Sequence, residues 1–152
     1  MKRLFLFGVT TFLIIQILSC KSSYNSASVN YLSGTEQTVT VRVVGIGSNE
    51  DQAVINAEQK VFDHLLFRGL PESKQKMPLL GYDESAEKLK HKEYFDKFYS
   101  GQRHKSFVMA SIPVSSLIKV KGGKSITVDV KVNLSALRGD LETFGVIRKF
   151  GL

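Results

Sequence analysis

The sequence has 152 residues, a mass of 17.0 kDa and a formal net charge of +7 at pH 7. This length favours one compact domain, and a composition of 43% hydrophobic and 23% charged residues excludes a disordered or fibrous chain. The single cysteine, Cys20, excludes an internal disulfide and a zinc site built on several cysteines.

Residues 1–19 predict a secretory signal peptide. Two basic residues follow the first methionine, and residues 4–19 carry no charge, a stretch shorter than the roughly 20 residues of a membrane-spanning helix. The segment Ile17-Leu18-Ser19-Cys20 resembles the lipobox of bacterial lipoproteins. The resemblance implies that Cys20 is alkylated by diacylglycerol, that the chain is cut before it, and that the new amine is acylated. The alternative is an uncleaved helix with a free cysteine.

The residues after the cysteine bear on localisation and domain boundaries. Lys21-Ser22-Ser23 lacks both the aspartate that retains lipoproteins at the inner membrane of enteric bacteria and the acidic cluster of some surface-exposed Bacteroidetes lipoproteins. The resemblance therefore implies the periplasmic face of the outer membrane. Serine-rich residues 20–36 are expected to form the lipidated cysteine and a flexible tether, and residues 37–152 a single domain.

The first half of the predicted domain begins with a strand and continues with helices. Residues 37–46 alternate valine with polar residues, which is typical of a strand with one buried face. Ser48 is expected to cap a helix that runs to Arg68-Gly69. A second helix is predicted over residues 84–99, capped by Asp83.

The second half predicts a strand-rich segment followed by a helix. Pro113 marks an edge or bulge because proline cannot donate to a strand ladder, and Gly122-Gly123 predicts a hairpin turn. Asn133 is expected to cap a last helix that ends at Gly145. The expected strands lie at residues 107–112, 117–121, 125–132 and 146–150.

Strands and helices that are each apolar on one side need to cover one another. We therefore predict an α+β fold: a two-layer sandwich in which an antiparallel-rich sheet is covered by about three helices, in the order β-α-α-β-β-α.

Two glycine motifs resemble nucleotide-binding loops but depart from them. After Gly45-Ile46-Gly47 a dinucleotide fingerprint needs a third glycine where Glu50 stands, and this carboxylate would repel a pyrophosphate. Gly122-Gly123-Lys124-Ser125 ends like a P-loop, but a strand is predicted after it. We expect tight turns at both places. Since the sequence has no nucleophile elbow and its three histidines share no ligand spacing, we predict no enzyme, no metal and no cofactor.

The strongest charge feature lies between residues 88 and 105, where six lysine and arginine residues outnumber two acids and aromatic residues are interleaved. An envelope location argues against nucleic acid as a partner. Three interpretations stay open: a solvated helix face over an aromatic core, a contact with anionic headgroups or lipopolysaccharide, and a docking face for an acidic protein. The candidate partner-binding residues are Lys88, Lys90, Lys92, Tyr94, Lys97, Tyr99 and Arg103.

The Ser-rich tether, the strand over residues 38–47 and the helix ending Leu65-Leu66-Phe67-Arg68-Gly69 resemble small envelope lipoproteins of the Bacteroidetes. Among these, the pattern resembles the accessory lipoprotein of a Bacteroidetes-type type VI secretion system, and also flagellum-associated lipoprotein domains. The resemblance implies a lipid-anchored, non-enzymatic subunit that binds other subunits of a trans-envelope assembly. The alternative is an envelope lipoprotein that recognises an anionic lipid or glycan.

Overall fold

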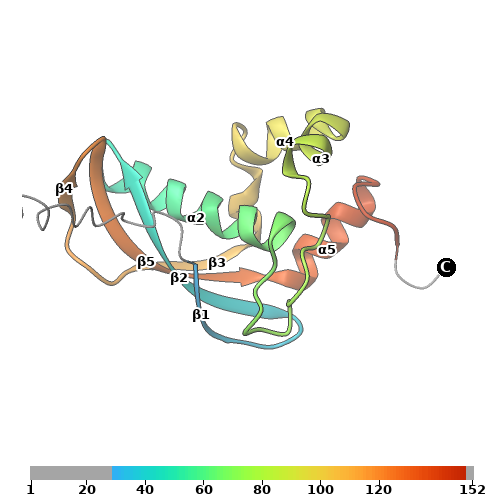
Figure 1. Cartoon of the computed structure of the whole chain (residues 1–152), viewed down its shortest axis with the longest axis horizontal. Coiled ribbons are helices and arrows are strands. Elements are labelled where there is room, and N and C mark those ends of the chain that lie inside the picture. Colours follow the sequence, from blue (N-terminus) through green and yellow to red (C-terminus); the bar gives the residue numbers. More distant parts are fainter. Residues whose placement is uncertain (1–28, 150–152) are drawn as a thin grey trace, which may run out of the picture.

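The computed structural model describes residues 29–149, so the predicted signal peptide, Cys20 and most of the predicted tether lie outside the described residues. Figure 1 shows a twisted sheet with helices packed against one face. The sheet has five antiparallel strands in the order β1-β2-β5-β3, and β4 also pairs with β5. The predicted two-layer α+β architecture is confirmed.

The strands are β1 (Asn30–Gly34), β2 (Thr38–Gly47), β3 (Val108–Pro113), β4 (Ile118–Val120) and β5 (Gly123–Asn133). The helices are α2 (Glu50–Phe67), α3 (Glu84–Lys90), α4 (Lys92–Tyr99), the 3-10 helix η2 (Arg103–Phe107) and α5 (Leu134–Thr143). No helix between residues 29 and 149 is both long enough and apolar enough to cross a membrane.

The centre of the sheet is the long antiparallel pair β2–β5, which is in register from Thr38 opposite Asn133 to Gly47 opposite Lys124. The predicted alternation is confirmed in both strands, because every second residue is buried on the side that α2 covers and, apart from Gly45, is a valine or isoleucine. On the other face, Arg42 donates two hydrogen bonds to Asp129, at 2.7 and 2.8 Å, and the guanidinium lowers the pKa of that carboxyl. The sheet therefore has one buried apolar face and one outward face, on which this ion pair lies beside the exposed apolar side chains of Val44 and Ile112.

Helix α2 lies very close to β2, and two glycines make this possible. A Cβ atom added to Gly45 would lie 1.9 Å from the Ala53 carbonyl oxygen. One added to Gly47 would lie 2.4 Å from the Ala53 nitrogen. The helix is capped by Asn49, whose side chain accepts a hydrogen bond from the Gln52 amide at 2.9 Å, so the prediction of Ser48 as the cap was wrong by one residue. The strand continues to Gly47, which moves the start of the helix along the chain.

Strand β1 corrects the predicted boundary between tether and domain. Residues 30–34, assigned to the tether, pair with β2 across an irregularity between Tyr31 and Ser33. Tyr31 packs partly buried against the core. These residues are a strand because they cover the free edge of β2, which their serine and glycine content does not reveal.

Three further predictions needed correction. The expected helix over residues 84–99 is two helices, because the backbone leaves the helical region at His91, with φ −115° and ψ 38°. Residues 146–149 form no strand; instead the Val146 amide donates to the Leu141 carbonyl at 2.8 Å, and Val146 is buried. The tight hairpin turn consists of Lys121 and Gly122, because Val120 pairs with Gly123. The predicted caps Asp83 and Asn133 are confirmed.

A polar cluster joins α2, η2 and β3 on the face of the sheet that the helices cover. The Ser111 hydroxyl donates to Glu58 Oε1 at 2.7 Å, and His104 Nε2 lies 3.6 Å from Glu58 Oε2. The His104 ring is fully buried, and its Nδ1 donates to the Phe98 carbonyl oxygen, 2.9 Å away. Burial alone would raise the pKa of Glu58, but His104 and Ser111 outweigh it, so this pKa lies below its ordinary value.

Glu58→Gln is expected to destabilise the fold at neutral pH by about 1–3 kcal/mol, because it leaves His104 buried without its carboxylate. Since the folded pKa of Glu58 is lowered, its carboxylate stabilises the wild type above the unfolded pKa, and this contribution is lost as the pH falls through the folded pKa. Urea unfolding at several pH values should therefore show a weaker acid dependence for the variant. Glu36→Gln, in an exposed loop, is the control. Parallel pH profiles for wild type and Glu58→Gln would contradict this role.

Candidate functional site

The predicted partner-binding residues lie on α3, α4 and η2, and several of them are bound to their own neighbours. The Lys88 ammonium donates to Glu84 at 2.7 Å and to Asp63 at 3.2 Å, and lies 4.5 Å from the centre of the Tyr99 ring. Burial alone would lower the pKa of Lys88, but the two carboxylates raise it. The Tyr99 hydroxyl donates to the same Asp63 carboxylate at 2.6 Å. Lys88 and Tyr99 therefore fasten α3 and α4 onto α2.

A second cluster fastens α4 and η2 to α5. The Tyr94 hydroxyl donates to Asp140 at 2.8 Å, and burial together with this carboxylate raises the tyrosine pKa. Arg103 pairs with the other oxygen of Asp140, and its guanidinium lies 4.4 Å from the centre of the Phe144 ring. The Tyr94 ring itself is buried against Phe98. Both tyrosines of the candidate set thus serve the packing of the domain.

The exposed lysines of α4 are paired within the helix. Lys97 donates to Glu93 at 2.8 Å, and Lys92 pairs with Asp96, each one turn away. Lys90 forms no ion pair with any residue between 29 and 149. Lys90, Lys92, Tyr94, Lys97 and Arg103 line one hollow of about 260 Å³, so the structure brings five of the seven candidates together.

Asp140→Ala is expected to cost about 1–3 kcal/mol of folding stability, because it leaves the buried Tyr94 hydroxyl and Arg103 without their shared acceptor. Glu93→Ala, which breaks the exposed pair with Lys97, should change the unfolding midpoint little. Chemical denaturation of the two variants measures the difference. Equal losses would show that the Asp140 cluster does not hold α4 and η2 against α5.

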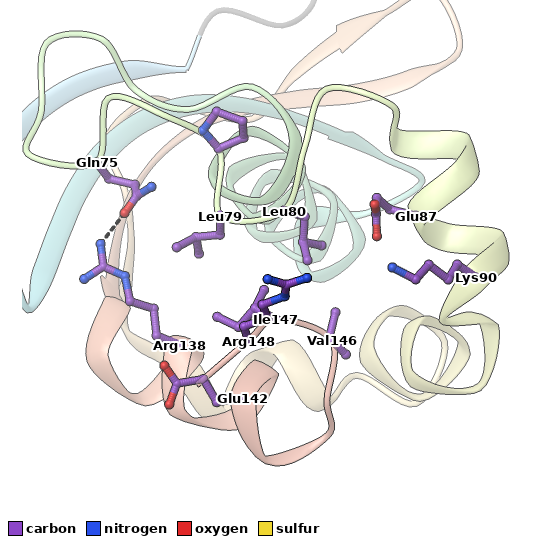
Figure 2. A pocket seen from close by; sticks show the side chains of 11 residues that line it. Gln75, Leu79, Leu80, Glu87, Lys90, Arg138, Glu142, Val146, Ile147 and Arg148 are labelled. Atoms are coloured by element: carbon purple, nitrogen blue, oxygen red, sulfur yellow. Dashed lines mark hydrogen bonds between the residues drawn. The ribbon is translucent and has the colours of Figure 1, made fainter. Parts of the chain in front are cut away.

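A larger groove lies on the other side of Lys90, between the loop that follows α2 and the last helix. Figure 2 shows its lining, and its volume is about 690 Å³. Two regions that are distant in sequence form it: the loop before α3 together with α3, and α5 together with the residues after it. The lining residues are Gln75, Pro78, Leu79, Leu80, Glu87, Lys90, Arg138, Glu142, Val146, Ile147 and Arg148.

The groove has an aliphatic floor that is fixed by backbone hydrogen bonds. The amides of Leu79 and Leu80 donate to the carbonyls of Leu65 and Leu66, at 2.9 and 3.0 Å, which ties the loop to the C-terminal end of α2. Val146 is held by its bond to the Leu141 carbonyl. The loop and the chain after α5 therefore form two fixed walls, and the floor is present without a ligand.

Charged side chains surround this floor. In Figure 2, Glu87 and Lys90 enter from α3 on one side, Arg138 stands on the opposite side, and Arg148 lies above the aliphatic centre. Arg138 donates to the buried Gln75 side chain. Glu87 lies 3.8 Å from His91. The groove thus offers a fixed apolar surface with charged groups of both signs around it.

The sequence identified one lining residue of this groove as a candidate, Lys90. It missed Arg138 and Arg148, which no spacing rule connects to Lys90 because they come from the other end of the chain. Leu79 and Leu80 lie partly buried against the core of the domain. Among residues 29–149, no three histidine, cysteine, aspartate or glutamate side chains are grouped as a metal site.

Comparisons of the chain with family models, curated proteins and solved structures found no match. The function of the chain therefore has to be argued from its own residues and geometry.

Proposed function

We propose that the chain is a lipid-anchored protein of the bacterial envelope that acts as a non-enzymatic interaction subunit of a trans-envelope assembly, at the periplasmic face of the outer membrane. The observation that carries this proposal is the segment Ile17-Leu18-Ser19-Cys20, which follows a basic start and an uncharged stretch. Two or three acyl chains on Cys20 would give stable membrane attachment, whereas one chain binds only marginally. The resemblance stated above makes a type VI secretion apparatus the proposed assembly.

The proposed docking surface is the hollow on α4 with its exposed lysines. A folded domain on a lipid anchor presents this surface to other proteins of the same compartment. The internal ion pairs described above reduce the net charge of this surface. We therefore expect the exposed Phe144 ring and the lysine side chains of the hollow to recognise shape as well as acidic groups.

Lys90→Glu combined with Lys97→Glu tests this surface, because both side chains line the hollow and neither is buried. After affinity purification from membranes, a stoichiometric protein partner of the wild type should be lost from this double variant. The partner should still bind the control variant Lys131→Glu, because Lys131 is an exposed lysine on β5 that lies outside the hollow. Retention of the partner by the double variant would contradict the proposed surface.

The second candidate function is that of an envelope lipoprotein that binds an anionic lipid or glycan. The groove of about 690 Å³ favours it, because its size lies within the range of small-molecule sites and its apolar floor is preformed. The two functions use neighbouring surfaces that meet at Lys90.

A further inference from the structure

We propose that the groove beside Lys90 binds a single-chain amphiphile: an aliphatic chain that ends in a carboxylate or phosphate. This inference rests on the second candidate function and selects between its two ligand classes. Three features of the groove support it: the aliphatic floor, the cations Lys90 and Arg148, which form no ion pair within residues 29–149, and the excess of cations over acids in the lining.

The floor selects an aliphatic chain. Leu79, Leu80, Val146 and Ile147 line the centre of the groove, with Pro78 beside them. Sugar rings stack well on aromatic faces, but no aromatic side chain of residues 29–149 lines this groove. Burial of each methylene group against such a floor strengthens binding about fourfold, so a longer chain binds more tightly.

The cations select an anionic end group. Neither Lys90 nor Arg148 forms an ion pair with any residue between 29 and 149, and both point to the aliphatic centre in Figure 2. Arg138 is held by Gln75, which keeps its guanidinium at the opposite wall. A carboxylate or phosphate placed between Lys90 and Arg148 would gain hydrogen bonds with charged donors at both sides.

The two acids of the groove do not cancel these cations. Three cations, Lys90, Arg138 and Arg148, line the groove, against the two acids Glu87 and Glu142. The lining therefore has an excess of positive charge, and the groove complements an anion that is attached to an apolar chain. A cationic or uncharged amphiphile gains the floor contact only.

The test uses the full chain, purified with its lipid anchor from membranes and placed in phosphatidylcholine nanodiscs. The probe is a fatty acid that carries a photoreactive diazirine on its chain, and the matched probe is the alcohol of the same length. Mass spectrometry of the cross-linked peptides locates the label. We expect the carboxylate probe to label the segments around Leu79 and Ile147 about tenfold more strongly than the alcohol.

Arg148→Gln and Lys90→Gln should each reduce this labelling several-fold, whereas Lys131→Gln on the far side of the sheet should not. Both residues are exposed, so these variants are expected to fold. Equal labelling by acid and alcohol, or unchanged labelling of the variants, would overturn the inference. Anion-dependent label at another surface would contradict the groove but keep a lipid-binding function, while no label anywhere on the domain would contradict both.

Discussion

Replacing Cys20 with alanine is expected to move almost all of the protein out of the membrane fraction. Only the thiol can form the thioether to diacylglycerol, so the variant loses every acyl chain that the lipobox resemblance implies. At about 0.8 kcal/mol for each buried CH₂ group, the loss of two or three chains removes stable attachment. Sodium carbonate washing of membranes, followed by immunoblotting of pellet and supernatant, measures the change.

Ser19→Ala is the matched control for this experiment, since it keeps a small residue before the cysteine and should leave the protein in the pellet. The domain of the Cys20→Ala variant should stay folded, because the core described for residues 29–149 does not include Cys20. Persistence of Cys20→Ala in the washed pellet would contradict the proposed anchor, whatever surface of the domain binds a partner.

Gly45→Ala is expected to destabilise the fold strongly, because among the glycines of residues 29–149 an added Cβ would make its shortest contact here. The new Cβ atom would lie 1.9 Å from the Ala53 carbonyl oxygen and 2.9 Å from the Ala57 side chain, so α2 would have to move away from β2. Such overpacking costs about 3 kcal/mol or more, because α2 covers the centre of the sheet. Urea unfolding followed by circular dichroism measures the loss.

Gly139→Ala makes the same chemical change at a place where it should help. Gly139 lies in α5, is exposed, and an added Cβ would meet nothing within 4 Å. Alanine is favoured over glycine in a helix interior by up to about 1 kcal/mol, so this variant should be slightly more stable than the wild type. A Gly45→Ala protein with wild-type stability would show that the helix and the strand are less closely packed than described.

The central strands could be predicted from the sequence because their signal is local. Valines at every second position of β2 and β5 specify one buried face without reference to other segments. Strand β1 has no such alternation, and only the edge of β2 makes residues 30–34 a strand. The break at His91 was missed for a related reason: α3 has no buried residue, so the orientation of α4 depends on the contacts of its own aromatic residues.

The groove could not be predicted, because its lining depends on tertiary packing. Arg138 and Arg148 become neighbours of the loop around Gln75 only when that loop binds the C-terminal end of α2 and the chain after α5 folds back. The charge-rich segment was correctly identified as distinctive. Its pairing with Asp63 and Asp140, which come from α2 and α5, was invisible in the sequence.

The early start of β1 sets a limit on where the domain can work. Ten positions separate Cys20 from Asn30, and a fully extended chain of that length spans at most roughly 33–36 Å. With the proposed acyl chains in the outer membrane, this span is the greatest distance between the bilayer surface and the start of β1. The domain would then meet its partners only in a thin layer next to the membrane. Components that remain deeper in the periplasm would have to extend toward the membrane to meet it.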